Sequence, residues 1–339
     1  MKRKWLWVAA FILFLGVLLA ACGGADEDVS TEEGGKAENG SDDGAQEGEK
    51  PDFMSMLTGG TSGTYYPLGG EMASIISNDT GIQTDAVSSN ASADNAVALQ
   101  EEEAELAFVQ TDVISHAVEG INVFEGKPID NVLALGSLYP ETIQIVTTAD
   151  SGVESVEDLE GKTVSVGAPG SGTYVNAEQI LEIHGLAMDD IHAENLDFGE
   201  STGGIQDGNI DAAFITAGTP TGAVEGLQAS ADVHIVPIEE DKIEEMIEEY
   251  PYYAEDTIPE GTYGLEEDVQ TVAVMAMLAV TDNLSEDVVY DITKAIYENA
   301  GTISHARGDS ITTDIALDGI GIDLHPGAEK YFEEAGVLE

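Results

Sequence analysis

The sequence predicts an α/β protein that folds as two similar lobes with mostly parallel sheets. Two observations carry this prediction. Short apolar runs alternate with helix-like stretches from residue 52 onward, and one strand–loop–helix pattern occurs twice. Alternation of this kind is typical of α/β domains. Residues 52–339 are enough for two lobes that each bury a core.

Several of the expected strands are continuous apolar runs, as in sheets that are covered on both faces. Strands are expected at residues 53–57, 106–110, 132–139, 143–148, 163–168, 212–216, 233–238 and 269–282. Helices are expected at residues 65–78, 93–102, 174–184, 239–249 and 285–305.

The repeated pattern consists of "FMSMLTGGTSGTYYPLGGEMASII" (53–76) and "TVSVGAPGSGTYVNAEQILEIHG" (163–185). One such loop could be a tight turn and nothing more. Two of them suggest two lobes, each with a loop at the carboxyl edge of its sheet, where open α/β sheets place ligands. The run at 269–282 would then return the chain to the first lobe. We expect lobe 1 at 52–142 and 268–339, and lobe 2 at 143–267.

The N-terminus reads as a secretory signal, because "MKRK" is followed by an apolar run over residues 5–21. The run is shorter than the roughly 20 residues of a membrane-spanning helix. "LAAC", ending at Cys22, resembles the bacterial lipobox, so residues 1–21 are expected to be a lipoprotein signal peptide and Cys22 the lipidated residue. The alternative is an uncleaved anchor with an idle thiol. The lipidated form would sit on the outer face of the cell membrane without crossing it.

Residues 22–51 are expected to be a disordered acidic tether, because residues 25–50 hold ten acidic residues, two lysines and no aromatic. Without Lys2, Arg3 and Lys4, 8 basic residues remain against 66 acidic ones, a net charge of about −58. Such self-repulsion needs screening by salt, which predicts a salt-loving source. The same charge argues against a nucleic-acid partner, whose phosphates need clustered lysine and arginine.

No catalytic template fits the glycine-rich loops. No lysine lies between Lys50 and Lys127 to complete a phosphate-binding loop, and Val175 stands where a dinucleotide fingerprint needs glycine. The nucleophile-elbow pattern fails at Ser62 and at Ser171. The histidines are scattered, at positions 116, 184, 192, 234, 305 and 325. We therefore expect no enzyme activity, no cofactor and no metal site.

Both loops can instead hold an anion. Each precedes a helix start, where N–H groups lack partners and the helix dipole is positive. The cradle is expected at Thr61–Thr64 and Gly170–Thr173, because the chain beyond Cys22 offers one arginine, Arg307, and seven lysines. The alternative is that Ser171 or Thr173 only caps its own helix.

Other polar residues follow the expected strands and so point to the same edge, although each could be ordinary turn chemistry. They are Ser88 and Ser89, Gln110, Tyr139, and Thr216, Gly218 and Thr219. Of the neighbours Tyr65 and Tyr66, we expect Tyr66 to form one wall of the pocket. Packing of either ring into the core is the alternative, since adjacent helical positions point apart.

In order along residues 53–336, several segments resemble the TAXI family of solute-binding proteins, which serve tripartite ATP-independent periplasmic (TRAP) transporters. They are "GGTSGTYYPLGG", "LGSLYPETIQIV", "VGAPGSGT", "DAAFITAGTPTGA", "DVQTVAVMAMLAVTDNLSEDVVYDITKAIYEN" and "LHPGAEKYFEEAG". Where Thr219 stands, many relatives carry an aromatic residue. The arginine that pairs with carboxylates in the better-known branch of TRAP binding proteins has no evident counterpart.

This resemblance implies a two-lobed fold of the type II periplasmic-binding kind, with the ligand in a cleft between the lobes. It implies a small carboxylate or amino-acid ligand, such as glutamate, glutamine or 2-oxoglutarate, and delivery to a TRAP permease. By motif position the ligand contacts fall on Gly60, Thr61, Ser62, Gly63, Thr64, Tyr66, Ser171, Gly172 and Thr173. Two alternatives stay open: a binding lipoprotein of an ATP-driven importer, and a secreted hydrolase that uses carboxylates.

Overall fold

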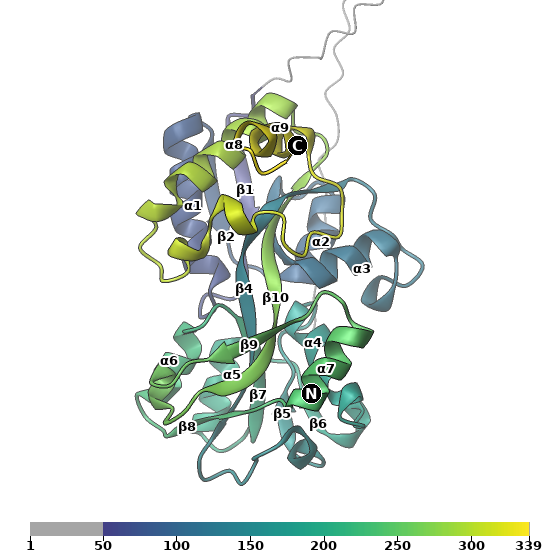
Figure 1. Ribbon diagram of the computed structural model, residues 1–339, viewed down its shortest axis with the longest axis vertical. Coiled ribbons are helices and arrows are strands. Elements are labelled where there is room, and N and C mark those ends of the chain that lie inside the picture. The colour runs from purple at the N-terminus through teal and green to yellow at the C-terminus, as the bar shows by residue number, and fades with distance from the viewer. Residues whose placement is uncertain (1–49, 339) are drawn as a thin grey trace, which may run out of the picture. The chain divides into compact units, whose positions relative to one another are not determined.

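The computed structural model describes residues 50–338, which lie in one compact unit. The expected signal peptide at 1–21, Cys22 and nearly all of the expected tether at 22–51 fall outside the described residues. Among the described residues, no helix is long and apolar enough to cross a membrane. The α/β prediction is confirmed, and the two lobes are joined by the long strands β4 and β10 (Figure 1).

The strands follow the apolar runs of the sequence. They are β1 (Phe53–Leu57), β2 (Gln83–Val87), β3 (Leu106–Gln110), β4 (Val132–Thr148), β5 (Thr163–Ser165), β6 (His192–Glu194), β7 (Ala212–Ala217), β8 (Val233–Val236), β9 (Ala254–Ile258) and β10 (Val269–Thr281). The α-helices are α1 (Tyr65–Thr80), α2 (Ser92–Gln100), α3 (Thr111–Glu119), α4 (Gly172–Ile183), α5 (Phe198–Gln206), α6 (Gly222–Gln228), α7 (Glu240–Glu249), α8 (Glu286–Asn299) and α9 (Pro326–Glu334).

The strands form one sheet in the order β2-β1-β3-β10-β4-β7-β5-β6, with β8 paired to β4 and β9 paired to β10. β1, β2 and β3 are parallel, and so are β5, β6 and β7. β4 and β10 are antiparallel to their neighbours. The expectation of mostly parallel strands is therefore wrong for the centre of the sheet, because β4 and β10 carry the chain between the lobes in opposite directions.

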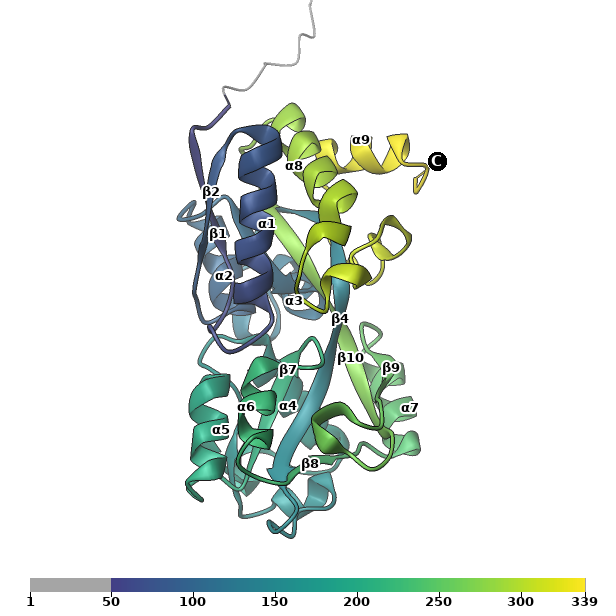
Figure 2. The same ribbon diagram turned by 90° about the vertical axis from the view of Figure 1, so that its left-hand side faces the viewer.

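Two strands expected on either side of Pro140 are one continuous strand, β4. Pro140 lies opposite Met275 of β10, and the register of β4 against β10 shifts at Leu138 and again at Leu135. Proline lacks the N–H of a ladder hydrogen bond, and bulges are among the few places where a sheet accepts it. The nearest shift lies two residues before Pro140, and β4 runs through both lobes, which Figure 2 shows from the side.

The buried apolar side chains form separate cores. Two clusters contain residues 54–139 and 276–332, together with Val175, and two clusters contain residues 143–274. On β10 the change comes after Val274, because Val272 and Val274 pack in the core of residues 143–274. We therefore call residues 52–142 and 275–338 lobe 1, and residues 143–274 lobe 2.

Helix α1 shows how the sequence positions the first loop. Its buried residues include Tyr65, Leu68, Met72 and Ile76, a helical spacing that turns one face onto β1 and β3. Gly69 belongs to the same face, where an added Cβ would lie 2.6 Å from Cγ2 of Thr58. The loop before α1 is therefore held against the end of β1.

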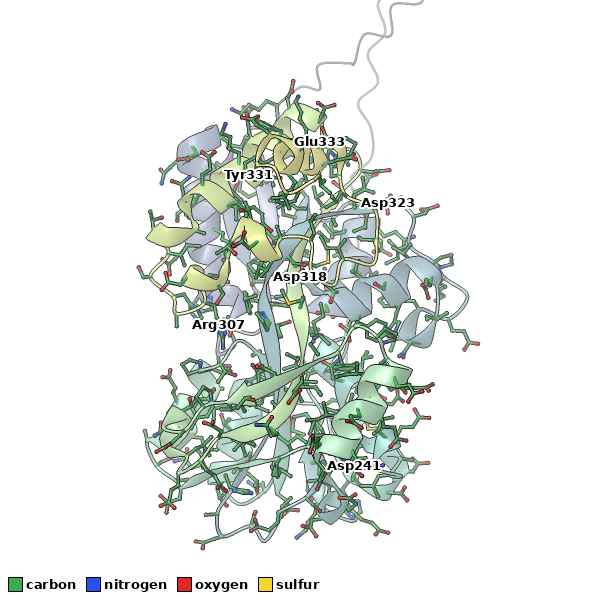
Figure 3. All side chains as sticks on the ribbon, viewed as in Figure 1. Asp241, Arg307, Asp318, Asp323, Tyr331 and Glu333 are labelled. Carbon is green, nitrogen blue, oxygen red and sulfur yellow. The ribbon has the colours of Figure 1, made fainter. Side chains whose placement is uncertain are left out.

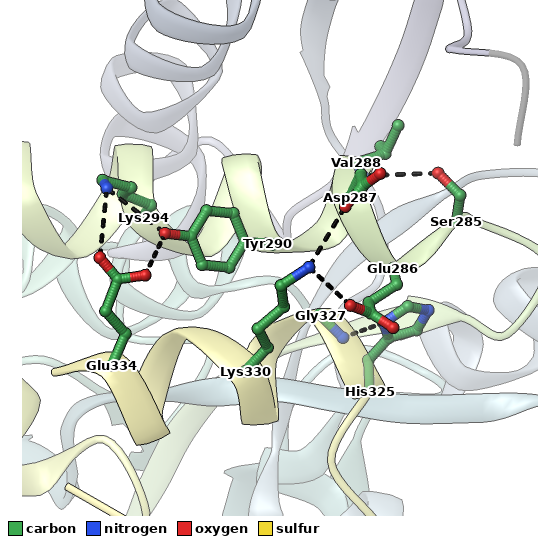
Figure 4. A network of polar contacts seen from close by, with 10 residues as sticks. All are labelled: Ser285, Glu286, Asp287, Val288, Tyr290, Lys294, His325, Gly327, Lys330 and Glu334. Atoms are coloured by element: carbon green, nitrogen blue, oxygen red, sulfur yellow. Dashed lines mark hydrogen bonds and ion pairs between the residues drawn. The ribbon is translucent and has the colours of Figure 1, made fainter. Parts of the chain in front are cut away.

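Helix α8 is shorter than expected, since it ends at Asn299 and not at residue 305. Gly301 lies in a short 3₁₀ turn just beyond, and glycine disfavours a helix interior. Helix α9 packs beside α8, where Tyr290 donates to Glu334 over 2.5 Å (Figure 4). Lys294 and Lys330 lie 5.5 and 5.4 Å from the centroid of the Tyr290 ring.

Candidate functional site

A cavity of about 240 Å³ lies between the lobes, beyond the carboxyl ends of β1, β2, β3, β5 and β7. Its wall is built from the ends of strands, the loops that follow them and the first residues of the next helices, together with Glu141 of β4. The lining residues are Gly59, Gly60, Thr61, Gly63, Thr64, Tyr65, Ser88, Ser89, Asn90, Ala91, Ser92, Gln110, Glu141, Ala168, Ser171, Gly172, Thr173, Asp197, Phe198, Thr216 and Ala217.

Five helices begin at this cavity. The N-cap residues of α1 to α5 all line it: Thr64, Ala91, Gln110, Ser171 and Asp197. The first three make no side-chain cap hydrogen bond. Helix N-termini attract negative charge through their dipoles, and first-turn N–H groups without a partner in the chain can bind an anion. Some of these groups already have partners, because Ala93 and Asp94 of α2 donate to the Gly170 carbonyl, and α4 and α5 are capped by Ser171 and Asp197. The cavity is thus suited to an anionic group without any basic side chain in its wall.

The second loop lines the cavity and also caps its own helix, which the sequence left open as an alternative. The Ser171 hydroxyl accepts a hydrogen bond from the backbone N–H of Tyr174 over 3.3 Å, so Ser171 caps α4 while it lines the cavity. Thr64 behaves differently. Its hydroxyl donates to the Gly218 carbonyl of lobe 2 over 3.1 Å, which ties the start of α1 to the other lobe.

Ten of the fourteen ligand-contact residues predicted from sequence line the cavity. They are Gly60, Thr61, Gly63, Thr64, Ser88, Gln110, Ser171, Gly172, Thr173 and Thr216. Four lie elsewhere. The Ser62 carbonyl accepts from Ala223 of lobe 2. Tyr139 is fully buried in a core.

The other two residues outside the cavity are Tyr66 and Thr219. Tyr66 is 38 % exposed and lines a surface depression beside β2. Its neighbour Tyr65 takes the place that we expected for Tyr66, because the buried face of α1 passes through position 65. The Thr219 carbonyl accepts a hydrogen bond from Arg307, and the Thr219 hydroxyl is buried without a partner.

Sequence reasoning missed the most unusual group of the site, Glu141. This side chain is 3 % exposed, and Oε2 accepts a hydrogen bond from the Tyr65 hydroxyl over 2.5 Å. Burial raises the pKa of Glu141 to about 8. The hydrogen bond from Tyr65 opposes this rise, Asp112 adds to it, and Arg307 opposes it. A signal was available, because Glu141 is the one charged residue in the sequence of β4.

No lysine, arginine or histidine is among the described residues that line the cavity, whereas two carboxyl groups, Glu141 and Asp197, do line it. The arginine of the folded part, Arg307, lies where the two lobes meet (Figure 3). Its guanidinium donates to the Thr219 carbonyl instead of entering the cavity wall. Within residues 50–338, no cluster of three or more histidine, cysteine, aspartate or glutamate side chains could hold a metal ion.

A buried polar network beside the cavity joins the lobes. Nε2 of Gln110 in lobe 1 donates to Oδ1 of Asn176 in lobe 2 over 2.9 Å, and Thr216 donates to the same oxygen over 3.0 Å. Nδ2 of Asn176 donates to Asp112 of lobe 1 over 2.9 Å. The lobes are therefore described in a closed arrangement, with Asn176 bonded across the seam.

The model of one protein family, described as the NMT1-like family, matches residues 56–336. This stretch contains both loops, β4 and β10. The chain belongs to the NMT1-like family.

Solved structures share the fold of this NMT1-like protein. The alkanesulfonate-binding protein SsuA from Xanthomonas axonopodis pv. citri, bound to MOPS, is 15 % identical with a TM-score of 0.51, over 84 % of each chain. A protein from Bordetella bronchiseptica RB50 is 17 % identical with a TM-score of 0.53, over 84 % of this chain and 82 % of that one. The two-lobed periplasmic-binding-protein fold is thus confirmed.

Proposed function

We propose that the protein is an extracytoplasmic receptor that encloses a small amino acid, of the glutamate or glutamine kind, and delivers it to a membrane importer. The single observation that carries the ligand class is the pairing in one cavity of five helix N-termini with the buried Glu141. The N-termini suit a carboxylate. A buried carboxyl group without a cationic contact suits an ammonium group.

Glu141 distinguishes the amino acid from the other organic anions that the sequence resemblance implies. A 2-oxoglutarate molecule has a keto oxygen where glutamate has its ammonium group, so it gives Glu141 no positive partner. At pH 7 the raised pKa keeps Glu141 protonated in the empty cavity. An incoming ammonium group would favour the carboxylate, and binding would then release a proton.

The test is isothermal titration of the purified protein in molar salt with glutamate, glutamine and 2-oxoglutarate. We expect the amino acids to bind more tightly than 2-oxoglutarate. Titrations at pH 7 in buffers with different ionisation enthalpies should reveal a proton released on binding. Tighter binding of 2-oxoglutarate, or proton uptake with glutamate, would reject the amino acid as ligand.

Two classes of importer are candidates for the partner. The family match and the solved binding proteins favour a binding protein of an ATP-driven importer. The TRAP permease is supported by the sequence resemblance alone. We therefore propose the ATP-driven importer first. Attachment to the membrane through Cys22 remains part of the proposal. Uptake by vesicles that hold the partner permease decides between the classes, because one depends on internal ATP and the other on an ion gradient.

A further inference from the structure

Gly172, in the second loop, faces the opposite lobe as well as the cavity. In Gly172 of lobe 2, an added Cβ would lie 1.1 Å from Oε1 and 2.3 Å from Cδ of Gln110 in lobe 1. In Gly170 of lobe 2, it would lie 2.2 Å from Oδ1 of Asp94 in lobe 1. Real Cβ atoms essentially never come within 3.0 Å of another heavy atom. A methyl group at Gly172 is thus incompatible with the closed lobes as they stand. Gly170 differs, because its φ of +78° requires glycine by itself and because Asp94 is exposed and free to move aside.

The same relation recurs along the seam. A Cβ on Gly218 would lie 2.8 Å from Cγ of Arg307. One on Gly63 would lie 3.3 Å from Phe198, a tighter contact than most, which a shift of a few tenths of an ångström relieves. In each case the glycine and the atom it would meet belong to different lobes. By contrast, Gly203 and Gly226, on helices of lobe 2, have no such atom within 4 Å.

Gln110 cannot simply turn aside. The residue is 2 % exposed, its Nε2 donates to Asn176 of lobe 2, and its Oε1 accepts from the Ser92 hydroxyl over 3.4 Å. Displacement of the amide by a methyl group would break the Asn176 contact across the seam. The backbone adds a second link, because the N–H groups of Ala93 and Asp94 both donate to the Gly170 carbonyl.

We propose that Gly172 is a closure residue, kept without a side chain so that Gln110 of the other lobe can pack against it when the cavity shuts. Gln110 is the positioning residue of this contact, since it reaches Gly172 and Asn176 together while it lines the cavity. The inference rests on the proposed function in one respect, namely that the closed lobes enclose a ligand. Closure of this kind is a hinge motion between lobes.

The experiment measures closure and binding separately. Spin labels at Asp85→Cys in lobe 1 and Asp207→Cys in lobe 2, in the full chain with Cys22→Ser, report the distance across the side away from β4 and β10 (Figure 2). We expect Gly172→Ala to lengthen this distance, with and without glutamate. It should also weaken glutamate binding at least tenfold. Gly203→Ala is the matched control and should change neither quantity.

The decisive step is rescue. In a Gln110→Ala background, the atoms that the new methyl group would meet are gone, so Gly172→Ala should then change affinity less than threefold. Gly218→Ala is the second variant should Gly172→Ala fail to fold, and it should lengthen the same distance. Unchanged distance and affinity in Gly172→Ala, or absence of rescue, would overturn the inference. If the wild type does not bind glutamate, the ligand proposal fails, while the distances without ligand still test closure.

Discussion

Replacement of Glu141 by glutamine tests the central electrostatic claim about the cavity. The substitution keeps the shape of the side chain and its contact with Tyr65, but removes the negative charge that an ammonium group would meet. A hydrogen bond to a charged group contributes about 1.5–3 kcal/mol, and about 1.4 kcal/mol corresponds to a factor of ten. We therefore expect Glu141→Gln to weaken glutamate binding roughly 10- to 100-fold at pH 8.5.

The pH dependence gives a second magnitude. With a pKa of about 8, Glu141 is mostly protonated at pH 7, and binding of an ammonium group must displace that proton. The carboxylate fraction rises about eightfold between pH 7 and 8.5 for such a pKa. Wild-type affinity for glutamate should strengthen by a similar factor over this range, and that of Glu141→Gln should stay flat.

The assay is isothermal titration in 2 M salt at several pH values, with 2-oxoglutarate as the second ligand. Glu244→Gln, on the exposed face of α7, removes a carboxylate outside the cavity and should behave as wild type. An affinity for glutamate that falls as pH rises would refute the reasoning. It would mean that protonated Glu141 donates to a carboxylate of the ligand instead of accepting from an ammonium group.

Three further predictions follow from the same contacts. Tyr65→Phe removes the hydrogen bond that lowers the pKa of Glu141, so the pH midpoint of glutamate binding should move up, whereas Tyr66→Phe should leave it in place. A pKa raised by burial keeps Glu141 neutral in the folded chain while the unfolded chain ionises. Its contribution to stability is thus full below about pH 4.5 and is lost as pH rises to about 8. Urea unfolding should show wild type losing stability relative to Glu141→Gln between pH 5 and 8. Because salt screens the repulsion among the excess acidic residues, the melting temperature should rise between 0.15 and 2 M NaCl. An unchanged melting temperature would contradict a role for screening.

Most strands could be predicted, because an unbroken apolar run is expected to form a strand that is buried on both faces. "LAFVQ" is buried at every position of β3, as its unbroken pattern requires. The continuity of β4 could not be predicted in this way. Pro140 is a strong local stop signal, and only the paired strand β10 makes an irregular ladder more stable than a turn. Tertiary pairing overrides local preference here.

The choice between Tyr65 and Tyr66 shows what the sequence held and local reasoning overlooked. Leu68, Met72 and Ile76 set the buried face of α1, and that face includes position 65 and excludes position 66. Glu141 was harder to find, since 66 acidic residues hide any single carboxylate. Its position amid the apolar residues of β4 distinguished it, but whether it faces a cavity or the core depends on packing that the sequence does not state.

The glycines of the two loops satisfy two requirements, ligand access and closure of the lobes, and the sequence alone does not distinguish them. An anionic group can reach the N–H groups at a helix start only where side chains are small. In the closed form, the opposite lobe must reach the same backbone, as Gln110 reaches Gly172 and Phe198 reaches Gly63. A substitution at either glycine would thus weaken binding under both explanations. Only the compensating change on the other lobe distinguishes them, because truncation of Gln110 makes room for a methyl group at Gly172 and gives the ligand no new donor.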